Sequence, residues 1–129
     1  MNTLRTGATA LGIATLLAVP TALVTASPAS ADIERGGSCG GARYELNVDR
    51  ERGGFEVDAD IENAAAGSRW RIVLKHDGKI YYNRIRTTDR EGDVDVERFR
   101  QNTAGKDRLG LRVKNLRTGE VCRTRIVTS

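Results

Sequence analysis

Four acidic residues alternate strictly with apolar ones in the segment F-E-V-D-A-D-I-E-N, residues 55–63. The last three acids have the spacing that opens a calcium-binding EF-hand loop, where carboxylates at alternate positions supply oxygen ligands. That loop also needs glycine at its sixth position and glutamate at its twelfth, and the chain has Asn63 and Arg69 there. We therefore exclude an EF-hand and keep weak binding of divalent cations as an alternative to a solvated strand face.

Catalytic chemistry has little support in the sequence. The only histidine, His76, precedes Asp77-Gly78, a pair favoured in two-residue hairpin turns because both central positions need positive φ. We expect His76 to be an exposed polar residue of that turn. No G-x-S-x-G motif is present, and the acids that can be placed on strands are expected on outer faces, where burial cannot tune their pKa. The sequence therefore predicts no enzyme and no cofactor.

The N-terminal segment, residues 1–31, has the three parts of a secretory signal peptide. Residues 1–5 carry one positive charge, residues 8–24 form an acid-free apolar run, and Ala-Ser-Ala at 29–31 supplies small residues for cleavage. We predict cleavage after residue 31, which routes the product outside a bacterial cell. An uncleaved membrane anchor is the alternative, although Pro20 interrupts the apolar run and a span needs about 20 apolar residues.

Two cysteines, Cys39 and Cys122, lie near opposite ends of the predicted mature chain. In an oxidising compartment we expect them to form one disulfide. Closing a loop of this length stabilises a fold by about 4–5 kcal/mol in the chain-entropy model. A shared metal or two reactive thiols are the alternatives, but a single histidine leaves too few partner ligands for a typical zinc site.

The chain after residue 41 alternates apolar and polar residues with period two, and no window keeps a helical period. This pattern predicts an all-β domain at residues 42–129, a single seven-stranded antiparallel β-sandwich. A polar, glycine-rich lead that carries Cys39 precedes it at residues 32–41. The strands are expected near residues 43–49, 55–62, 69–75, 80–85, 94–99, 108–114 and 121–127.

A resemblance to a known architecture follows from these elements. Trp70 on the third strand, V-x-V-x-x-F at 94–99 and the hairpin V-K-N-L-R-T-G-E at 113–120 resemble an immunoglobulin-like or fibronectin-III-like domain over residues 42–127. The likeness is to a superfold, and it implies that Trp70 lies in the core. No cysteine lies on the second or sixth strand, so a disulfide would instead fasten the lead to the last strand, since first and last strands can be neighbours in such sandwiches.

The alternation also separates the charges. If apolar residues face inward, the intervening residues point outward, and the resemblance implies that strands two and five share one sheet while strands three, six and seven share the other. The first sheet is then acidic outside, through Glu56, Asp58, Asp60, Glu62, Asp93, Asp95 and Glu97. The second is basic outside, through Arg69, Arg71, Lys75, Arg108, Arg112, Lys114, Arg123 and Arg125.

These features predict a secreted, non-enzymatic module that binds an anionic extracellular partner, such as a cell-wall polymer, through the basic face. Arginine suits phosphate and carboxylate groups because it donates bidentate hydrogen bonds. A merely solvated surface is the other interpretation of the same pattern. One of the adjacent residues Tyr81 and Tyr82 is expected to face outward and to offer a stacking surface, although the phase of residues 80–85 stays open.

Two further functions stay open. One is head-to-tail self-association, with the acidic sheet of one copy on the basic sheet of the next. The other is inhibition of a foreign enzyme through a hairpin tip such as residues 76–79. Nucleic acid is only an electrostatic possibility, because no binding motif for it is present. No segment after residue 31 resembles a membrane span, so the mature product is expected to be soluble.

Overall fold

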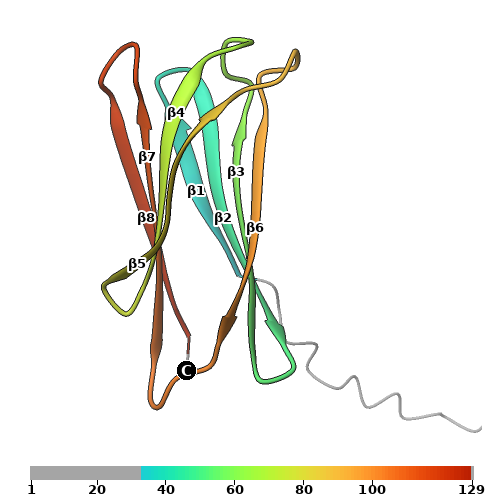
Figure 1. Cartoon of the computed structure of the whole chain (residues 1–129), viewed down its shortest axis with the longest axis vertical. Helices are drawn as coiled ribbons and strands as arrows, with labels where there is room; N and C mark the ends of the chain where they lie inside the picture. The colour runs from blue at the N-terminus through green and yellow to red at the C-terminus, as the bar shows by residue number, and fades with distance from the viewer. Residues whose placement is uncertain (1–32, 129) are drawn as a thin grey trace, which may run out of the picture.

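The computed structural model describes residues 33–128, and the predicted signal peptide with its cleavage site lies outside them. This part of the chain contains eight strands and no helix (Figure 1). No helix long and apolar enough to cross a membrane occurs in it. The strands are β1 (Ile33–Cys39), β2 (Ala42–Glu51), β3 (Gly54–Glu62), β4 (Arg69–His76), β5 (Lys79–Thr87), β6 (Val94–Gln101), β7 (Asp107–Asn115) and β8 (Val121–Thr128).

The strands form two antiparallel sheets of four, in the orders β1-β2-β3-β6 and β5-β4-β7-β8. Figure 1 shows them as two layers that face each other. The predicted all-β class is confirmed. So are the predicted neighbours, because β3 pairs with β6 while β4, β7 and β8 share the other sheet. The immunoglobulin-like assignment stays a prediction.

The expected count of seven strands is wrong, because β1 adds an eighth in the segment expected as a lead. Its sequence, I-E-R-G-G-S-C, lacks apolar alternation, and it is held instead by a continuous antiparallel register with β2, from Ile33 opposite Val48 to Cys39 opposite Ala42. A Cβ atom on Gly36 would overlap the backbone carbonyl of the neighbouring strand. Glycine is therefore what permits close backbone approach at this position.

The core lies between the two sheets and is built from the inward-facing residues of both. Trp70, Phe55 and Leu46 are among its largest fully buried side chains. The Trp70 indole donates a hydrogen bond to Ser68 Oγ at 2.9 Å, so its one polar atom is satisfied inside the fold. The expected core position of Trp70 is confirmed.

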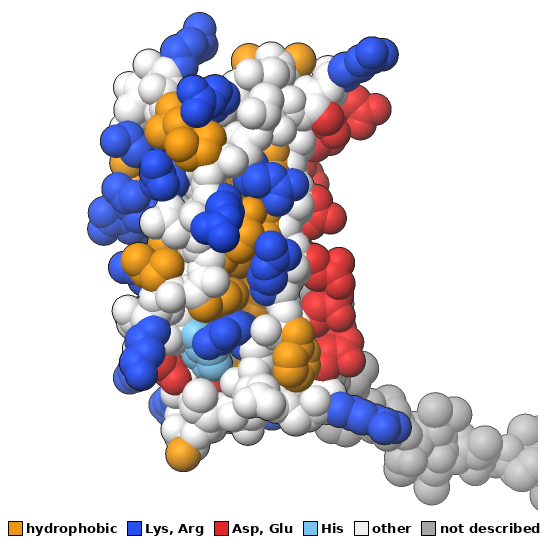
Figure 2. Space-filling view, in the orientation of Figure 1, with side chains coloured by type: hydrophobic (Ala, Val, Ile, Leu, Met, Phe, Trp, Pro, Cys, Tyr) orange, Lys and Arg blue, Asp and Glu red, His pale blue; other side chains and the backbone are white. Residues whose placement is uncertain are grey.

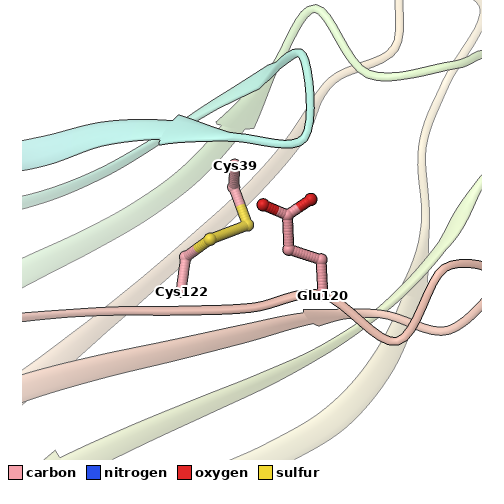
Figure 3. Close-up of side chains that lie close together, drawn as sticks. All are labelled: Cys39, Glu120 and Cys122. Atoms are coloured by element: carbon pink, nitrogen blue, oxygen red, sulfur yellow. A yellow bond between two sulfur atoms is a disulfide. The ribbon is translucent and has the colours of Figure 1, made fainter.

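A disulfide joins the two sheets along one edge. Cys39 at the end of β1 and Cys122 on β8 are bonded, with Cα atoms 6.0 Å apart (Figure 3). The predicted disulfide is confirmed, which removes a thiol metal site and reactive thiols from consideration. Strands β1 and β8, far apart in sequence, are neighbours here.

A β-bulge sets the phase of β5, which the sequence left open. The register with β4 shifts between Leu74 and Lys75, so Tyr82 opposes Leu74 and enters the core while Ile80 opposes Lys75 on the outer face. The hairpin turn before β5 is confirmed, since Asp77 and Gly78 have φ values of 51° and 81°.

We expect loss of the disulfide to lower the free energy of unfolding by up to about 4–5 kcal/mol, because the unfolded chain regains the freedom of a long loop. The comparison is between the wild type and the double variant Cys39→Ser/Cys122→Ser in urea denaturation. Adding a reductant should lower the wild-type midpoint to that of the variant and leave the variant unchanged. Equal midpoints without reductant would show that the bond contributes nothing.

Candidate anion-binding site on the basic sheet

All eight predicted basic residues lie on the outer side of the sheet β5-β4-β7-β8. They alternate with the core residues along three adjacent strands, so their side chains share one surface, which we call the basic face. Its central rows run across β4, β7 and β8 as Lys75, Gly110 and Arg125, and as Val73, Arg112 and Arg123. The predicted outward placement of these residues is confirmed. Binding of an anion by this face stays a prediction.

A hollow of about 740 Å³ lies in the middle of the basic face. Its border carries five cations, namely Arg71, Lys75, Arg112, Arg123 and Arg125. Its lining also includes Val73, which is only 4 % exposed although it faces outward, and Ile80, which is 55 % exposed. The surface therefore combines an apolar floor with a cationic rim, a combination that the sequence reading missed.

Gly110 creates depth at the centre of the hollow. A Cβ atom built there would meet only Lys75 Cβ at 3.8 Å and the Thr124 carbonyl oxygen at 4.0 Å, which are ordinary contacts. The backbone does not require glycine at this position, because its φ lies outside the left-handed region. A glycine inside a strand often marks a place where a ligand or another backbone approaches closely, and here there is room for such a group.

The cations around the hollow lack carboxylate partners. Within residues 33–128, none of the eight basic-face residues forms an ion pair. Arg71 instead donates a hydrogen bond from its guanidinium to Asn83 Oδ1 at 2.9 Å, which orients it beside the hollow. These charges are therefore available to an anionic ligand.

The cationic surface continues around the open edge of the sandwich, where β5 and β6 are the outer strands. Arg84 and Arg86 on β5 and Arg98 and Arg100 on β6 occupy inward-facing positions. Figure 2 shows lysine and arginine side chains crossing this edge above apolar side chains. This feature was not predicted from the sequence, because an arginine at an inward-facing position breaks the period-two alternation of apolar and polar residues.

Two of these arginines cover the adjacent tyrosines. Arg98 lies 4.8 Å from the ring centre of Tyr82, and Arg100 lies 4.2 Å from that of Tyr81. Burial raises the pKa of Tyr81 to about 12, although the two arginines oppose this shift. Neither ring is an exposed stacking surface, so that expectation is wrong, and cation-π contacts take its place.

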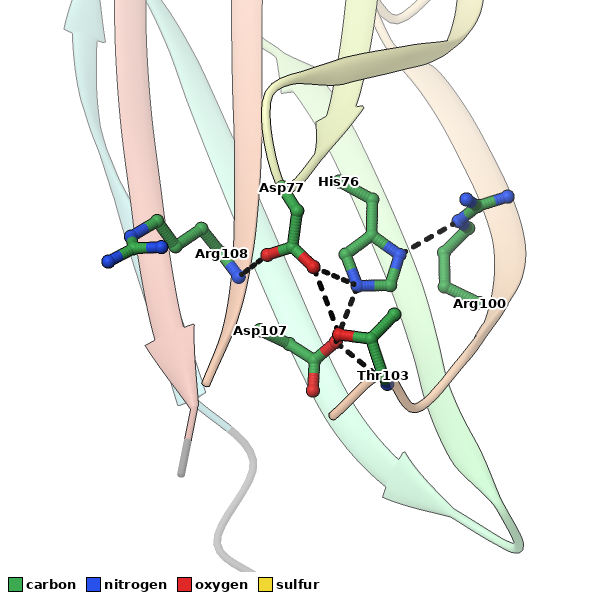
Figure 4. Close-up of polar contacts among 6 residues, drawn as sticks. All are labelled: His76, Asp77, Arg100, Thr103, Asp107 and Arg108. Carbon is green, nitrogen blue, oxygen red and sulfur yellow. Dashed lines mark hydrogen bonds and ion pairs between the residues drawn. The ribbon is translucent and has the colours of Figure 1, made fainter. Parts of the chain in front are cut away.

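His76 is buried, and its expected exposure is wrong. It occupies the inward phase of β4 at 4 % exposure. Arg100 Nε donates to His76 Nδ1 at 3.2 Å, which leaves Nε2 as the protonated ring nitrogen, 2.6 Å from Asp107 Oδ1 (Figure 4). Thr103 Oγ1 lies within 2.6 Å of the same oxygen and 3.0 Å from Asp77 Oδ2. This network ties the β4-β5 turn to the β6-β7 loop.

Asp107 has the opposite environment from the one expected of acids in this chain. It is buried, and burial alone raises its pKa. Hydrogen bonds from Thr103 and His76 outweigh burial and hold the pKa of Asp107 below its ordinary value. Both ring nitrogens of His76 have hydrogen-bond partners. We therefore interpret His76 and Asp107 as a structural connection between the two loops.

The predicted acidic residues gather on the outer side of the opposite sheet. Asp60 opposes Asp95 and Asp58 opposes Glu97 in the β3-β6 register, whereas Asp93 precedes β6 and accepts a hydrogen bond from the Asn63 backbone. Strands β1 and β2 extend this acidic face with residues that the prediction omitted. They are Glu34, Glu45, Asp49 and Glu51.

Crowding raises the pKa values of the central acids. A hydrogen bond and charge repulsion from Glu97 raise the pKa of Glu56 to about 7. Burial, with a hydrogen bond and repulsion from Asp95, raises that of Asp60 to about 7. Burial and neighbouring carboxylates also raise the pKa of Asp58. Oxygens of Glu56, Asp58 and Glu97 lie within 4.8 Å of one another, so the weak divalent-cation alternative stays a prediction.

Phe99 lies on the outer side of the acidic sheet. Strand β6 keeps its alternation, so Phe99 follows Asp95 and Glu97 outward. It is 54 % exposed and opposes Glu56. The acidic face therefore carries an exposed aromatic ring among its carboxylates.

Comparison of the chain with protein-family models, with curated proteins and with solved structures gave no match.

Stability should fall as the pH rises from about 4 to about 7. Glu56 and Asp60 have ordinary pKa values of 4.5 and 3.8 and folded values of about 7, so the folded state binds more protons in this window. We expect a thermal midpoint a few °C higher at pH 5 than at pH 8. Asp77 and Asp107, whose pKa values are lowered, lose their stabilising effect only at more acidic pH.

The double variant Glu56→Gln/Asp60→Asn should remove most of this difference and raise the midpoint at pH 8. Glu62→Gln, at the exposed end of the same strand, is the control and should preserve the difference. A wild-type midpoint that is higher at pH 8 than at pH 5 would contradict the argument.

Proposed function

We propose that this protein is a secreted, non-enzymatic module that binds an anionic extracellular polymer through its basic face. One observation carries the proposal: five cations without carboxylate partners surround one hollow on an otherwise regular sheet. The disulfide is compatible with an oxidising compartment outside the cytosol.

The regular spacing of the sheet favours a polymer over a single small anion. Neighbouring strands lie about 4.8 Å apart, and residues on one face repeat every ~6.8 Å along a strand. The cationic groups therefore form a grid, and a chain with repeated phosphate or carboxylate groups engages several of them at once. Such binding is electrostatic in large part and weakens as salt screens it.

The hairpin-tip alternative, enzyme inhibition through residues 76–79, gains no support from the geometry. His76 is buried, and both carboxylate oxygens of Asp77 are engaged, one by the Arg108 backbone N–H and one by Thr103. Of residues 76–79, Gly78 and Lys79 are exposed without such polar contacts, whereas Asp77 is exposed but held in place by its two hydrogen bonds.

The first test measures binding of the mature chain to immobilised polygalacturonate and to long-chain polyphosphate at several salt concentrations. Arg112→Gln/Arg123→Gln should weaken binding at least about tenfold and reduce the slope of log K against log salt by about two. The control, Arg52→Gln/Arg117→Gln, removes the same charge from exposed turns outside the basic face. Equal losses in the two variants would show that net charge alone, and no particular face, attracts the polymer.

The second test fills the hollow. Gly110→Val should fold and keep or raise the thermal midpoint, because a Cβ atom fits there and valine favours strands. We expect it to weaken polymer binding several-fold although every charge is kept. Unchanged binding would mean that the polymer contacts the cationic rim without entering the hollow.

A further inference from the structure

The two outer faces of this domain complement each other in charge. On the acidic face, Arg43 is the only cation among the outward positions of β1, β2, β3 and β6, and it is already paired with Glu45 at 3.1 Å. The remaining carboxylates have no positive partner in the described chain. On the basic face, the cations have no carboxylate partner in the described chain. Each face thus lacks the charges that the other presents.

The faces also complement each other in shape. Phe99 lies on the acidic face, 54 % exposed, with Glu56 opposite, Glu97 two residues before it and the end of its ring over Gly54. The hollow on the basic face is lined by Val73, which is nearly buried, by the exposed Ile80 and by a rim of five cations. An aromatic knob among carboxylates therefore corresponds to an apolar recess among guanidinium and ammonium groups.

The two faces cannot meet within one molecule, because they lie on opposite sides of the sandwich. Figure 2 shows most of the acidic side chains along one side and most of the lysine and arginine side chains over the rest of the visible surface. A second copy is the partner that supplies both complements. Such a contact is heterologous, because it joins the acidic face of one copy to the basic face of another. Each added copy leaves one acidic and one basic face free at the two ends, so the assembly can grow as a chain.

We propose that this protein self-associates head to tail, with Phe99 of one copy seated in the Gly110 hollow of the next and the surrounding carboxylates paired with the cationic rim. Both faces are four-stranded antiparallel sheets, so their side chains repeat with the same spacings of about 4.8 and ~6.8 Å. Rows of carboxylates can thereby align with rows of cations across the contact.

The size of the contact makes it weak. Four strands of seven to ten residues cover roughly 20 by 30 Å, which places the buried area at the low end for protein interfaces, in the class of transient contacts. Association therefore needs high protein concentration, and salt near 0.5 M should suppress it because the pairs are screened. The anionic polymer of the proposed function competes for the same basic face.

The experiment is sedimentation of the mature chain over a range of concentrations at low salt. The wild type should form dimers and longer species that dissociate at high salt. Phe99→Ser and Gly110→Val should each weaken self-association at least about tenfold. Ala66→Ser is the control, since it changes an exposed apolar side chain in the loop before β4, outside both faces, and should change nothing.

Mixing the two defective variants tests the direction of the contact. Phe99→Ser keeps an intact hollow and Gly110→Val keeps an intact knob, so an equimolar mixture should form 1:1 dimers that do not grow further. A wild type that stays monomeric, a Phe99→Ser variant that associates normally, or a mixture that stays monomeric would each overturn the proposal.

The failure of this inference is distinguishable from failure of the proposed function. Phe99 lies on the acidic face, so Phe99→Ser should bind polygalacturonate as the wild type does. Loss of self-association with polymer binding intact supports both proposals. Polymer binding without self-association of the wild type overturns only the inference, and self-association without polymer binding overturns only the proposed function.

Discussion

Burial of one apolar layer between two sheets fixes which strand residues in the described part of the chain point inward and which point outward. Leu46, Val57 and Ile61 on one sheet face Ile72, Leu74 and Leu111 on the other, all nearly inaccessible to solvent. Because successive strand residues point to opposite sides, residues between the core positions must point to water. Once the core is chosen, the outward positions are free of packing constraints, and the sign of their charge is left to function.

The sandwich keeps its two charged faces apart. Packed sheets lie about 10 Å from each other, and the side chains beyond each backbone add to that separation. Salt at physiological strength screens exposed charges over about 8 Å. The carboxylates on β3 and β6 therefore receive little compensation from the cations on β4, β7 and β8, and their mutual repulsion stays visible in the raised pKa values of Glu56 and Asp60.

The two edges of the sandwich are closed in different ways. Along β1 and β8 the closure is covalent, through the Cys39–Cys122 bond. Along β5 and β6 it is made by arginine guanidinium groups, since those of Arg98 and Arg100 lie over the rings of Tyr82 and Tyr81. Inward-pointing charges on exposed edge strands also discourage pairing with other chains through the backbone. Contacts between copies are thus directed to the side-chain faces.

Period-two alternation predicted which strand residues point inward and which point outward, while the strand neighbours followed from the resemblance to an immunoglobulin-like sandwich. The prediction was wrong where backbone pairing or an extra step of the alternation decided the structure. Strand β1 is held by backbone approach at Gly36, for which alternation carries no signal. His76 was assigned to the turn, whereas one more step of the alternation through Trp70, Ile72 and Leu74 places it inside.

The hollow could not be predicted, because it depends on which strands become neighbours. Gly110 is an ordinary strand glycine until the register places it between Lys75 and Arg125, with Val73 in the next row. Its two proposed occupants differ in how they gain affinity. A second copy brings one ring and a limited set of carboxylates, whereas a polymer brings many anionic groups on one chain, and linked contacts raise the effective concentration of each next one. Where both are present, the polymer therefore binds the basic face more tightly than a second copy does. Associated copies should then dissociate as the polymer takes the place of the neighbouring copy on each basic face.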